Sequence, residues 1–574
     1  MEAPFENIAD TLTARAQLQP HQEAVIFPSG RDAFGRVAYT HLTFAQLDQL
    51  STQVARGLLA KGIGQGLRTA FLVKPSLEFF VLTFALFKAK AVPVLIDPGI
   101  GIRSLRTCLK EAQAKAFLGI PAAHMARILF RWKGAGWTHL VSVSSRSFGS
   151  MICYQELLKA GAHPSAPQLP MTRSEEQAAI LFTSGSTGSP KGAVYTHANF
   201  LAQVRLLQKS LQIQPGERDL CTFPLFALFA PALGMTAVIP EMDFTRPGSV
   251  DPLKIKEAID NFGIHNMFGS PALIKRVGAW GSEQGWHFPS LQRVISAGAP
   301  VPAPVIANFR KLLPESAQFF TPYGATESLP VAIAESRMLL EDTQFLTREG
   351  HGLCIGTPAP ETEVRILRIT DEAMPQFNTL DLMPVGQIGE IAVAGPQRTL
   401  AYEQRPEADR LAKALEGSSG TIFHRMGDLG YLDSKGRLWF CGRRTQRVQS
   451  SQGPLYTIPC EAIFNQHPQI ARSALIGLGK IPHQVPAICI EVHGTLSPKA
   501  RTILFAELRE LALRYEHTRS IEHFFVHPRF PVDIRHNAKI FREKLKIWAD
   551  SQWQKRSLSP AAVASLAKPS SLNS

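Results

Sequence analysis

The chain has 574 residues, of which 45% are hydrophobic and 19% are charged. This composition is typical of a folded globular protein, and the length exceeds the ~100–200 residues of one domain, so several subdomains are expected. The formal net charge is +14, but no arginine-rich block or basic stripe with interleaved aromatic residues occurs. This argues against nucleic-acid binding and favours a peripheral membrane contact instead.

The cysteines and the N-terminal residues predict a cytoplasmic protein. Seven cysteines are scattered along the chain, odd in number and never in a CxxC pair, which argues for a reducing compartment and against a zinc site. The first ten residues, MEAPFENIAD, contain acidic residues where a signal peptide needs bases. The most apolar region, 79–96, is interrupted by Lys88, Lys90 and Pro93 and falls short of the ~20 apolar residues of a membrane span.

The first half of the chain alternates between helical and strand patterns. Residues 44–62 place apolar side chains at helical spacing and end in Gly62, a typical C-cap. A buried strand is expected over 69–73, a helix over 76–88 and a strand over 91–96. This alternation predicts an α/β fold with a doubly wound layer. The tail, 557–574, is rich in Ser, Ala and Pro and is predicted to be disordered.

The segment TSGSTGSPKG, 183–192, lies between two short strand-like runs, 178–182 and 193–195, so it predicts a loop joining two strands. Glycines expose backbone N–H groups, hydroxyls add donors and Lys191 adds a positive charge, so the loop suits phosphate. A Walker loop does not fit, because Pro190 precedes the lysine and a strand follows. A serine-glycine linker is the alternative, but linkers are rarely flanked by strands. The candidate phosphate-binding residues are Thr183, Ser184, Gly185, Ser186, Thr187, Gly188 and Lys191.

The segment FPLFALFAPALGM, 223–235, is almost wholly apolar yet carries two prolines. Proline removes a helical hydrogen bond, so a regular helix is disfavoured here. Core packing is the ordinary interpretation of such a segment.

The loop TSGSTGSPKG resembles the signature loop of the adenylate-forming superfamily, which includes acyl-CoA synthetases, luciferases and peptide-synthetase adenylation domains. Further segments follow in the family's order: SAGAP (296–300), YGATE (323–327), HRMGDLG (424–430) and GRRTQRVQ (442–449). The resemblance implies ATP and Mg²⁺ as cofactors. It also implies a large N-terminal adenylate-forming domain of doubly wound sheets over 1–441 and a small mobile α+β lid domain over 442–556.

The resemblance implies roles for single residues. Small residues of SAGAP pack against adenine, Tyr323 offers a ring face to the base, and Thr326 offers a hydroxyl to the α-phosphate. Glu327 is an oxygen ligand for Mg²⁺, and Asp428 accepts hydrogen bonds from the ribose hydroxyls. A simple Gly-Asp turn is the alternative for the Asp428 segment. The nucleotide-contacting set is Gly298, Ala299, Pro300, Tyr323, Gly324, Asp428 and Arg443.

Two further inferences follow from the resemblance. In the family the apolar segment borders the carboxylate substrate, which makes an acyl-binding wall the alternative to core packing. The candidate wall residues are Phe223, Leu225, Phe226 and Phe229. The segment PVDIRHNAKIFREKL carries Lys539, whose family counterpart swings into the site to bind the carboxylate and α-phosphate oxygens. The implied catalytic set is Lys539, Thr326 and Lys191.

Among the family's branches, the chain most resembles the β-lactone synthetases of bacterial long-chain olefin biosynthesis. The resemblance rests on FPLFALF, PYGATE, TIPCEAIFNQHP and PVDIRHNAKIFREKL. It implies ATP-dependent adenylation of a long-chain 3-hydroxy fatty acid, and then attack by the β-hydroxyl to give a β-lactone, AMP and pyrophosphate. Other enzymes of an olefin pathway are the implied partners.

Other activities remain open at this stage. Many CoA-using members of the family carry a lysine near the position of Gln449, on the path of the CoA thiol. This chain lacks that lysine, which weakens the inference that it binds CoA. A long-chain fatty acyl-CoA synthetase and an acyl-AMP ligase that loads a carrier protein are the enzyme alternatives. A nucleotide-binding scaffold that has kept the fold is the non-enzyme alternative.

Overall fold

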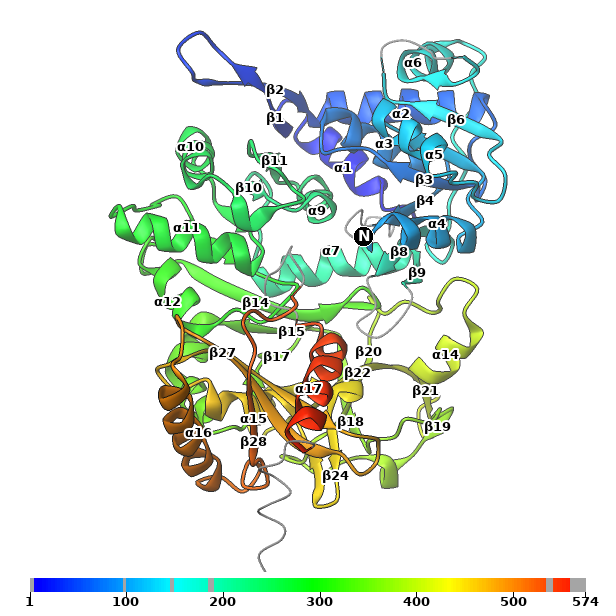
Figure 1. Ribbon diagram of the computed structural model, residues 1–574. Helices are drawn as coiled ribbons and strands as arrows, with labels where there is room; N and C mark the ends of the chain where they lie inside the picture. Colours follow the sequence, from blue (N-terminus) through cyan, green and yellow to red (C-terminus); the bar gives the residue numbers. More distant parts are fainter. Residues whose placement is uncertain (1–4, 97–99, 145–148, 184–189, 533–539, 558–574) are drawn as a thin grey trace, which may run out of the picture.

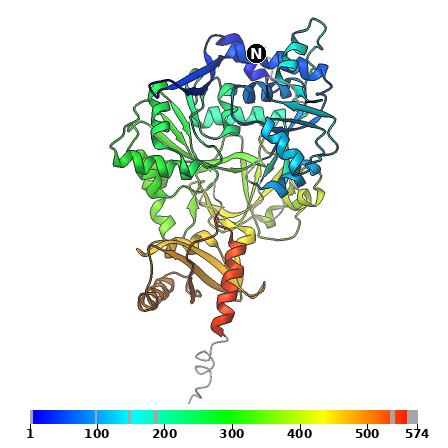
Figure 2. The ribbon, with the colours of Figure 1, turned by 45° about the horizontal axis from the view of Figure 1, so that its top comes forward.

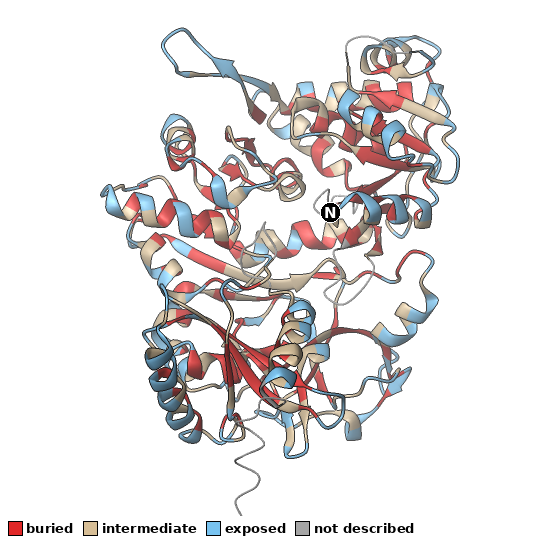
Figure 3. Cartoon of the chain, viewed as in Figure 1, coloured by how far each residue is buried: buried red, intermediate tan, exposed pale blue. Residues whose placement is uncertain are grey.

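The computed structural model describes residues 5–96, 100–144, 149–183, 190–532 and 540–557 (Figure 1). The fold is α/β, as the sequence predicts. Three large sheets with flanking helices form the N-terminal part of the chain, and a smaller group of strands and helices follows. Buried residues concentrate in the sheets and in the helix faces packed on them (Figure 3).

The first sheet has the strand order β7-β6-β5-β3-β4-β8-β9. All neighbouring pairs are parallel except β8 and β9. Its strands are β3 (Arg68–Leu72), β4 (Val92–Ile96), β5 (Ala116–Gly119), β6 (His139–Ser142), β7 (Ile152–Cys153), β8 (Gln177–Thr183) and β9 (Lys191–Thr196). The helices α2 (Phe44–Ala60), α3 (Leu77–Lys88) and α6 (Tyr154–Ala162) pack together on one cluster, and α4 (Ile102–Glu111) and α5 (Pro121–Leu129) pack on another.

Local signals explain these boundaries. Thr43 and Gln46 form a capping box at the start of α2, and Gly62, with φ of 78°, follows its end. The Ser76 hydroxyl accepts a hydrogen bond from the Phe79 amide and caps α3. The predicted helices and strands over 44–96 are therefore confirmed to within two residues.

The second sheet has the order β17-β15-β14-β13-β12-β10-β11-β1-β2. Its strands are β1 (Glu23–Arg31), β2 (Val37–Thr43), β10 (Arg218–Cys221), β11 (Thr236–Val238), β12 (Asn266–Phe268), β13 (Arg293–Ile295), β14 (Gln318–Ala325), β15 (Ser328–Glu335) and β17 (Thr357–Pro358). Its associated helices include α1 (Asp10–Leu18), α7 (His197–Leu211), α10 (Pro252–Phe262), α11 (Pro271–Glu283) and α12 (Ala303–Arg310).

The apolar segment 223–235 forms no single regular helix, as its two prolines predict. It is helical, but it is divided into two short helices, α8 (Pro224–Ala227) and α9 (Phe229–Leu233), that meet at Leu228. Pro224 is tolerated because it occupies the first turn of α8, where no intrahelical donor is needed. Proline therefore shapes this segment without preventing helix formation.

The third sheet contains β16 (Leu353–Cys354), β18 (Glu363–Leu367), β19 (Gln376–Phe377), β20 (Gly389–Ala394), β21 (Lys413–Glu416), β22 (Ile422–Leu432) and β23 (Leu438–Arg443). The short helices α13 (Gln344–Arg348) and α14 (Pro406–Ala412) lie in its connections. Asp428 lies inside β22 and pairs with Arg443 across the antiparallel ladder to β23. The Gly-Asp turn is therefore wrong as an interpretation, because the strand continues through this position.

The C-terminal elements are set apart from the three large sheets (Figure 2). They comprise the hairpin β24 (Val448–Ser450) and β25 (Gly453–Leu455), the sheet β26 (Ile470–Leu478), β27 (Val485–Val492) and β28 (His523–Val526), and the helices α15 (Thr457–Phe464), α16 (Pro498–Leu513) and α17 (Arg542–Ser557). Arg542 at the start of α17 makes a two-pronged ion pair with buried Glu461 on α15.

The tail predicted to be disordered lies, from residue 558, outside the described residues. Within the described part of the chain, no helix combines the length and apolarity that crossing a bilayer requires.

Candidate active site

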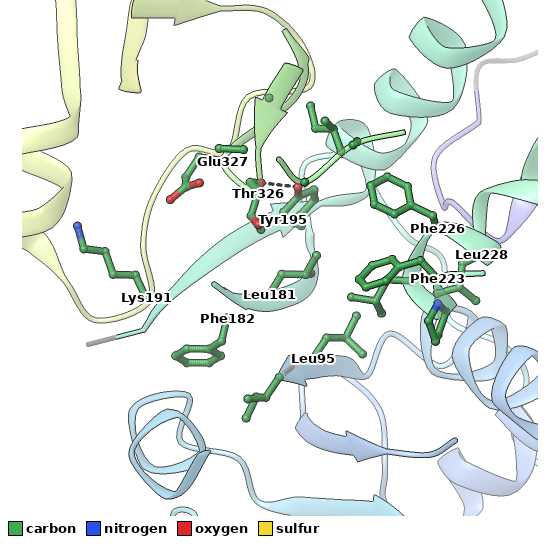
Figure 4. Close-up of a pocket in the computed structure, with 18 of the residues that line it drawn as sticks. Leu95, Leu181, Phe182, Lys191, Tyr195, Phe223, Phe226, Leu228, Thr326 and Glu327 are labelled. Carbon is green, nitrogen blue, oxygen red and sulfur yellow. Dashed lines mark hydrogen bonds between the residues drawn. The ribbon is translucent and has the colours of Figure 1, made fainter. Parts of the chain in front are cut away.

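One cavity of about 1910 Å³ is lined by residues of all three large sheets and by Pro531, Val532, Phe541 and Lys544 of the C-terminal elements. Lys191, Thr326 and Glu327 lie at one end, and Phe223 and Phe226 lie at the other (Figure 4). Residues of motifs that lie far apart in the chain, from Lys191 to Arg443, therefore meet around a single space.

Asp428 is the centre of a buried polar group. The Tyr323 hydroxyl donates to Asp428 Oδ2 over 2.6 Å, and Arg443 Nη1 lies 2.9 Å from Asp428 Oδ1. Burial raises the pKa of the Asp428 carboxyl, and the Arg443 charge opposes that rise. Oδ1 is ion-paired with Arg443, but the angle of that contact does not meet hydrogen-bond geometry. This oxygen can therefore still accept a hydrogen bond, which fits a ribose hydroxyl.

Glu327 is held by a residue that the motifs did not include. The Tyr402 hydroxyl donates to Glu327 Oε1 over 2.6 Å, and the Lys191 ammonium lies 5.0 Å from the centre of the Tyr402 ring. Tyr402 reaches this place because residues 401–403 pair with β9, which begins at Lys191. Burial and the Glu327 charge raise the pKa of Tyr402, so its hydroxyl stays protonated and donates. This tyrosine fixes one carboxylate oxygen beside the phosphate-loop lysine.

Glu327 also suits a magnesium ion. Mg²⁺ in nucleotide enzymes is bound by one or two carboxylates together with phosphate oxygens and water. One carboxylate with one oxygen fixed by Tyr402 fits that pattern, and no cluster of three or more metal-ligating side chains occurs within the described ranges.

The backbone at Thr326 is fixed from β9. The Tyr195 hydroxyl donates to the Thr326 carbonyl over 2.5 Å (Figure 4), and the Tyr195 ring stacks on Phe200 with 4.7 Å between ring centres. Burial raises the pKa of Tyr195, so the donor remains in place at neutral pH. The strand β9 therefore positions both Lys191 and the motif that carries Thr326.

The Lys413 ammonium is held close to the backbone that carries Glu327. Lys413 Nζ donates to the Thr399 carbonyl over 2.6 Å and lies 3.1 Å from His424 Nδ1. Burial and the charge of Arg398 lower the pKa of Lys413 to about 7. The Thr399 amide in turn donates to the Glu327 carbonyl over 2.8 Å. Most lysines of folded proteins are solvated, but Lys413 is largely desolvated, and Lys88 is buried and ion-paired to Asp48 at 2.7 Å.

The apolar wall is built from aromatic rings. Phe226 stacks on Phe268 with 4.6 Å between ring centres, and Phe226 also contacts Phe223 and Phe229. Leu95 and Leu181, from neighbouring strands of the first sheet, face the same space (Figure 4). The cavity continues between Phe71, Phe79, Phe84 and Phe87. This arm presents an apolar surface that suits an alkyl chain.

The structure brings most of the candidate residues that it describes to this cavity. The lining includes Lys191, Phe223, Leu225, Phe226, Phe229, Gly298, Gly324, Thr326, Glu327 and Arg443. Tyr323 and Asp428 lie directly behind it, and Ala299 and Pro300 do not line it. Ser184, Gly185, Ser186, Thr187, Gly188 and Lys539 lie outside the described residues, and Thr183 is described only as the last residue of β8.

The motif search missed Tyr195, Tyr402, Lys413 and His424. A signal for Tyr195 existed, because it lies in the short strand-like run that follows the phosphate loop. Tyr402 gave none, because its role depends on pairing with β9, far earlier in the sequence. Lys413 gave none either, because its role depends on the packing of β21 against β22.

Comparison with known proteins identifies the family. The model of the AMP-binding enzyme family matches residues 12–403. The chain belongs to this family. AMP-binding enzymes similar to it include an olefin beta-lactone synthetase of Xanthomonas campestris, which is 48% identical over 550 residues, covering 95% of this chain and 98% of that protein.

Solved AMP-binding enzymes share the fold. The amide bond synthetase of Marinactinospora thermotolerans gives a TM-score of 0.75 at 20% identity, covering 94% of this chain and 99% of that one. The O-succinylbenzoate coenzyme A synthetase of Bacillus subtilis, solved with ATP and a magnesium ion, gives 0.70 at 22% identity, covering 93% and 99%. Both likenesses support the arrangement of a large N-terminal part and a small C-terminal one.

Proposed function

We propose that the protein uses ATP and Mg²⁺ to adenylate a long-chain 3-hydroxy fatty acid and then closes the acyl-adenylate to a β-lactone. In the first step a carboxylate oxygen attacks the α-phosphorus of ATP and pyrophosphate leaves. In the second, the β-hydroxyl oxygen attacks the acyl carbon, the bond from that carbon to the phosphate oxygen breaks, and AMP and the hydroxyl proton are released. No external nucleophile is consumed.

The observation that carries this proposal is the single cavity that joins the phosphate-side residues to a long aromatic arm. A carboxylate placed between them would have its charged end near Lys191 and Thr326 and its alkyl chain among the phenylalanines. The product class comes from the 48% identical olefin beta-lactone synthetase, which covers nearly the whole chain.

The apolar arm supports the ring closure. A four-membered ring is strained, so the β-oxygen must be held close to the carbonyl and water must be kept away. Intramolecular placement can supply several of the ~7–11 kcal/mol that good orientation gives. Aromatic rings packed on one another, as at Phe226 and Phe268, form a wall that offers water no hydrogen bonds.

We also propose that residues 442–556 act as a lid that brings Lys539 to the reacting phosphate. Support comes from the residues on either side of the segment 533–539, since Pro531, Val532 and Phe541 line the cavity. The Phe541 amide donates to the Pro531 carbonyl over 2.8 Å, which ties the two ends of the segment together.

Product identification tests the proposal. The protein is incubated with MgATP and a long-chain 3-hydroxy acid, with and without CoA, and the products are identified by mass. We expect a β-lactone, AMP and pyrophosphate in both cases. Rapid formation of an acyl-CoA when CoA is present would instead establish an acyl-CoA synthetase, and a lack of ATP–pyrophosphate exchange would favour a nucleotide-binding scaffold.

A further inference from the structure

The outer face of α5 is apolar although it faces solvent. Met125, Ile128 and Leu129 are 71%, 66% and 74% exposed. They are spaced i, i+3 and i+4, so they lie on one side of the helix. The opposite side packs Ala123 and Ala126 on the first sheet, and buried His124 flanks the exposed face, with Nε2 2.9 Å from the Val141 carbonyl oxygen. The usual amphipathic arrangement would place polar residues outside, so this face indicates a contact with something apolar.

Basic residues surround this face. The outer side of α4 exposes Arg103, Arg106 and Lys110, and the turn after α5 exposes Arg131 and Lys133. None of these five makes an ion pair with another described residue. Residues 100–140 contain seven Lys and Arg and a single acidic residue, Glu111, whose carboxylate is paired with Arg405 at 2.7 Å. This stretch therefore carries +6 of the chain's net charge of +14.

The two helices form one surface. Leu105, Cys108 and Leu109 of α4 and Ala123 and Ala126 of α5 pack on the same hydrophobic cluster of the first sheet. Their outward sides therefore face the same way, at the side of the sheet where Figure 1 shows both helices. We call the exposed residues of α4, α5 and the turn to Lys133 the α4–α5 surface.

The α4–α5 surface adjoins the cavity. Ile120 and Ala123, at the start of α5, line the cavity, and so does the exposed residue Lys74 in the loop after β3. The cavity therefore reaches solvent beside the helix whose outer face is apolar. An alkyl chain leaving a bilayer at this surface would have a short path into the aromatic arm.

We propose that the α4–α5 surface docks on an anionic lipid bilayer. Large apolar side chains ringed by unpaired Lys and Arg are the combination that inserts shallowly among headgroups while attracting anionic lipid. A protein partner of matching chemistry would need an acidic rim around an apolar centre, whereas an anionic bilayer presents both over any area. The docking requires neither ATP nor turnover, so it stands or fails separately from the proposed reaction.

Vesicle co-sedimentation of the full chain tests this, with phosphatidylcholine vesicles that contain or lack phosphatidylglycerol. We expect binding to the anionic vesicles and a loss of roughly fivefold in partitioning for each basic residue whose charge is removed or screened. The double variant Ile128→Asp/Leu129→Asp should partition at least tenfold less, because it loses the burial of two large apolar side chains.

Two matched variants separate the contributions. Arg103→Glu/Arg106→Glu should weaken binding to anionic vesicles while leaving any binding to pure phosphatidylcholine unchanged. Leu380→Asp, at an apolar residue of the third-sheet region that is 90% exposed, should bind as the unaltered protein does. Circular dichroism confirms that each variant is folded.

Three results would overturn the proposal. One is equal partitioning of the Ile128→Asp/Leu129→Asp variant and the unaltered protein, and another is equal binding to neutral and anionic vesicles. The third is a concentration-dependent dimer in the absence of lipid that the double variant abolishes, since the surface would then be covered by a second copy of the chain.

Discussion

At the phosphate end of the cavity the Asp428 and Glu327 side chains and the Thr326 backbone are each held by a tyrosine hydroxyl, whereas the far end is formed by aromatic rings that contact one another. Asp428, Glu327 and Thr326 are fixed by tyrosine hydroxyls at 2.6, 2.6 and 2.5 Å. Phe223, Phe226 and Phe229 have only ring contacts of 4.6 to 6.2 Å. A hydrogen bond constrains the orientation of the two groups that it joins, whereas packed rings mainly define the volume of the space beside them.

This difference indicates that the phosphate end controls the rate of the reaction and that the aromatic end controls which acid binds. Charge development on a phosphate is stabilised by groups already in place, because no reorganisation is then needed during the reaction. An alkyl chain needs only dry, apolar volume. Substitutions at the phosphate end should therefore lower rate or nucleotide affinity, while substitutions at the aromatic end should alter affinity for the acid.

The largest effect is expected from Lys539→Ala. We expect adenylation to fall by roughly 10²–10³-fold with little change in ATP affinity, because the contact strengthens as charge builds on the phosphate. Pyrophosphate release measures the rate, and isothermal titration measures ATP binding. The exposed Lys555 provides the control, since Lys555→Ala should react normally. An unchanged rate in folded Lys539→Ala would show that this lysine does not belong to the phosphate end.

Asp428→Asn should weaken ATP binding by about 10–100-fold. The change removes the charge that pairs with Arg443 and leaves that guanidinium unpaired, and a hydrogen bond to a charged group is worth ~1.5–3 kcal/mol. ATP titration measures the effect. Asp433→Asn is the matched control, because Asp433 pairs with Arg437 on the same sheet outside the cavity. Equal losses in both variants would point to general destabilisation of the sheet.

Phe226→Ala should raise the KM for a long-chain acid roughly tenfold and leave ATP affinity unchanged. The expected loss corresponds to the ~1.5–3 kcal/mol gained by burying a large apolar side chain. Steady-state kinetics with acids of increasing length measure it, and the penalty should shrink for short acids. Phe345→Ala serves as the control because Phe345 is 67% exposed and does not line the cavity. If the penalty were independent of chain length, the alkyl chain would lie elsewhere.

The smallest effect is expected from Tyr402→Phe, which keeps the ring under Lys191 and removes only the hydroxyl bonded to Glu327. One net hydrogen bond of about 1 kcal/mol corresponds to about fivefold, so about fivefold more Mg²⁺ should be needed for half-maximal adenylation. Tyr431→Phe removes a comparable hydroxyl, bonded to the His351 carbonyl outside the cavity, and should leave the Mg²⁺ requirement unchanged. The same shift in both variants would contradict a specific role for Tyr402.

Local patterns in the sequence were sufficient for the elements over 44–96 and for the strands β8 and β9 on either side of the phosphate-loop motif. Capping residues, apolar spacing and glycine positions act within a few residues of chain, so they can be read directly. They do not decide positions where longer-range structure acts. A Gly-Asp pair alone is compatible with a turn, and only the order of the family motifs favoured the ribose-binding interpretation of Asp428. The strand β22 continues through this residue because β20 and β23 pair with that strand on either side.

By itself, the sequence determined the α/β class, the order of the ATP-site motifs and the identity of the candidate residues in them, because each motif is a short run of specific side chains. Only the tertiary structure decided that Tyr402 holds Glu327, that Lys413 lies behind it with a lowered pKa, and that the outer face of α5 is apolar beside basic α4. Tyr402 depends on pairing with β9, which lies far earlier in the chain. Lys413 depends on pairing with the neighbouring strand β22, and the exposure of α5 depends on which of its faces packs on the first sheet. None of these arrangements can be read from one segment alone.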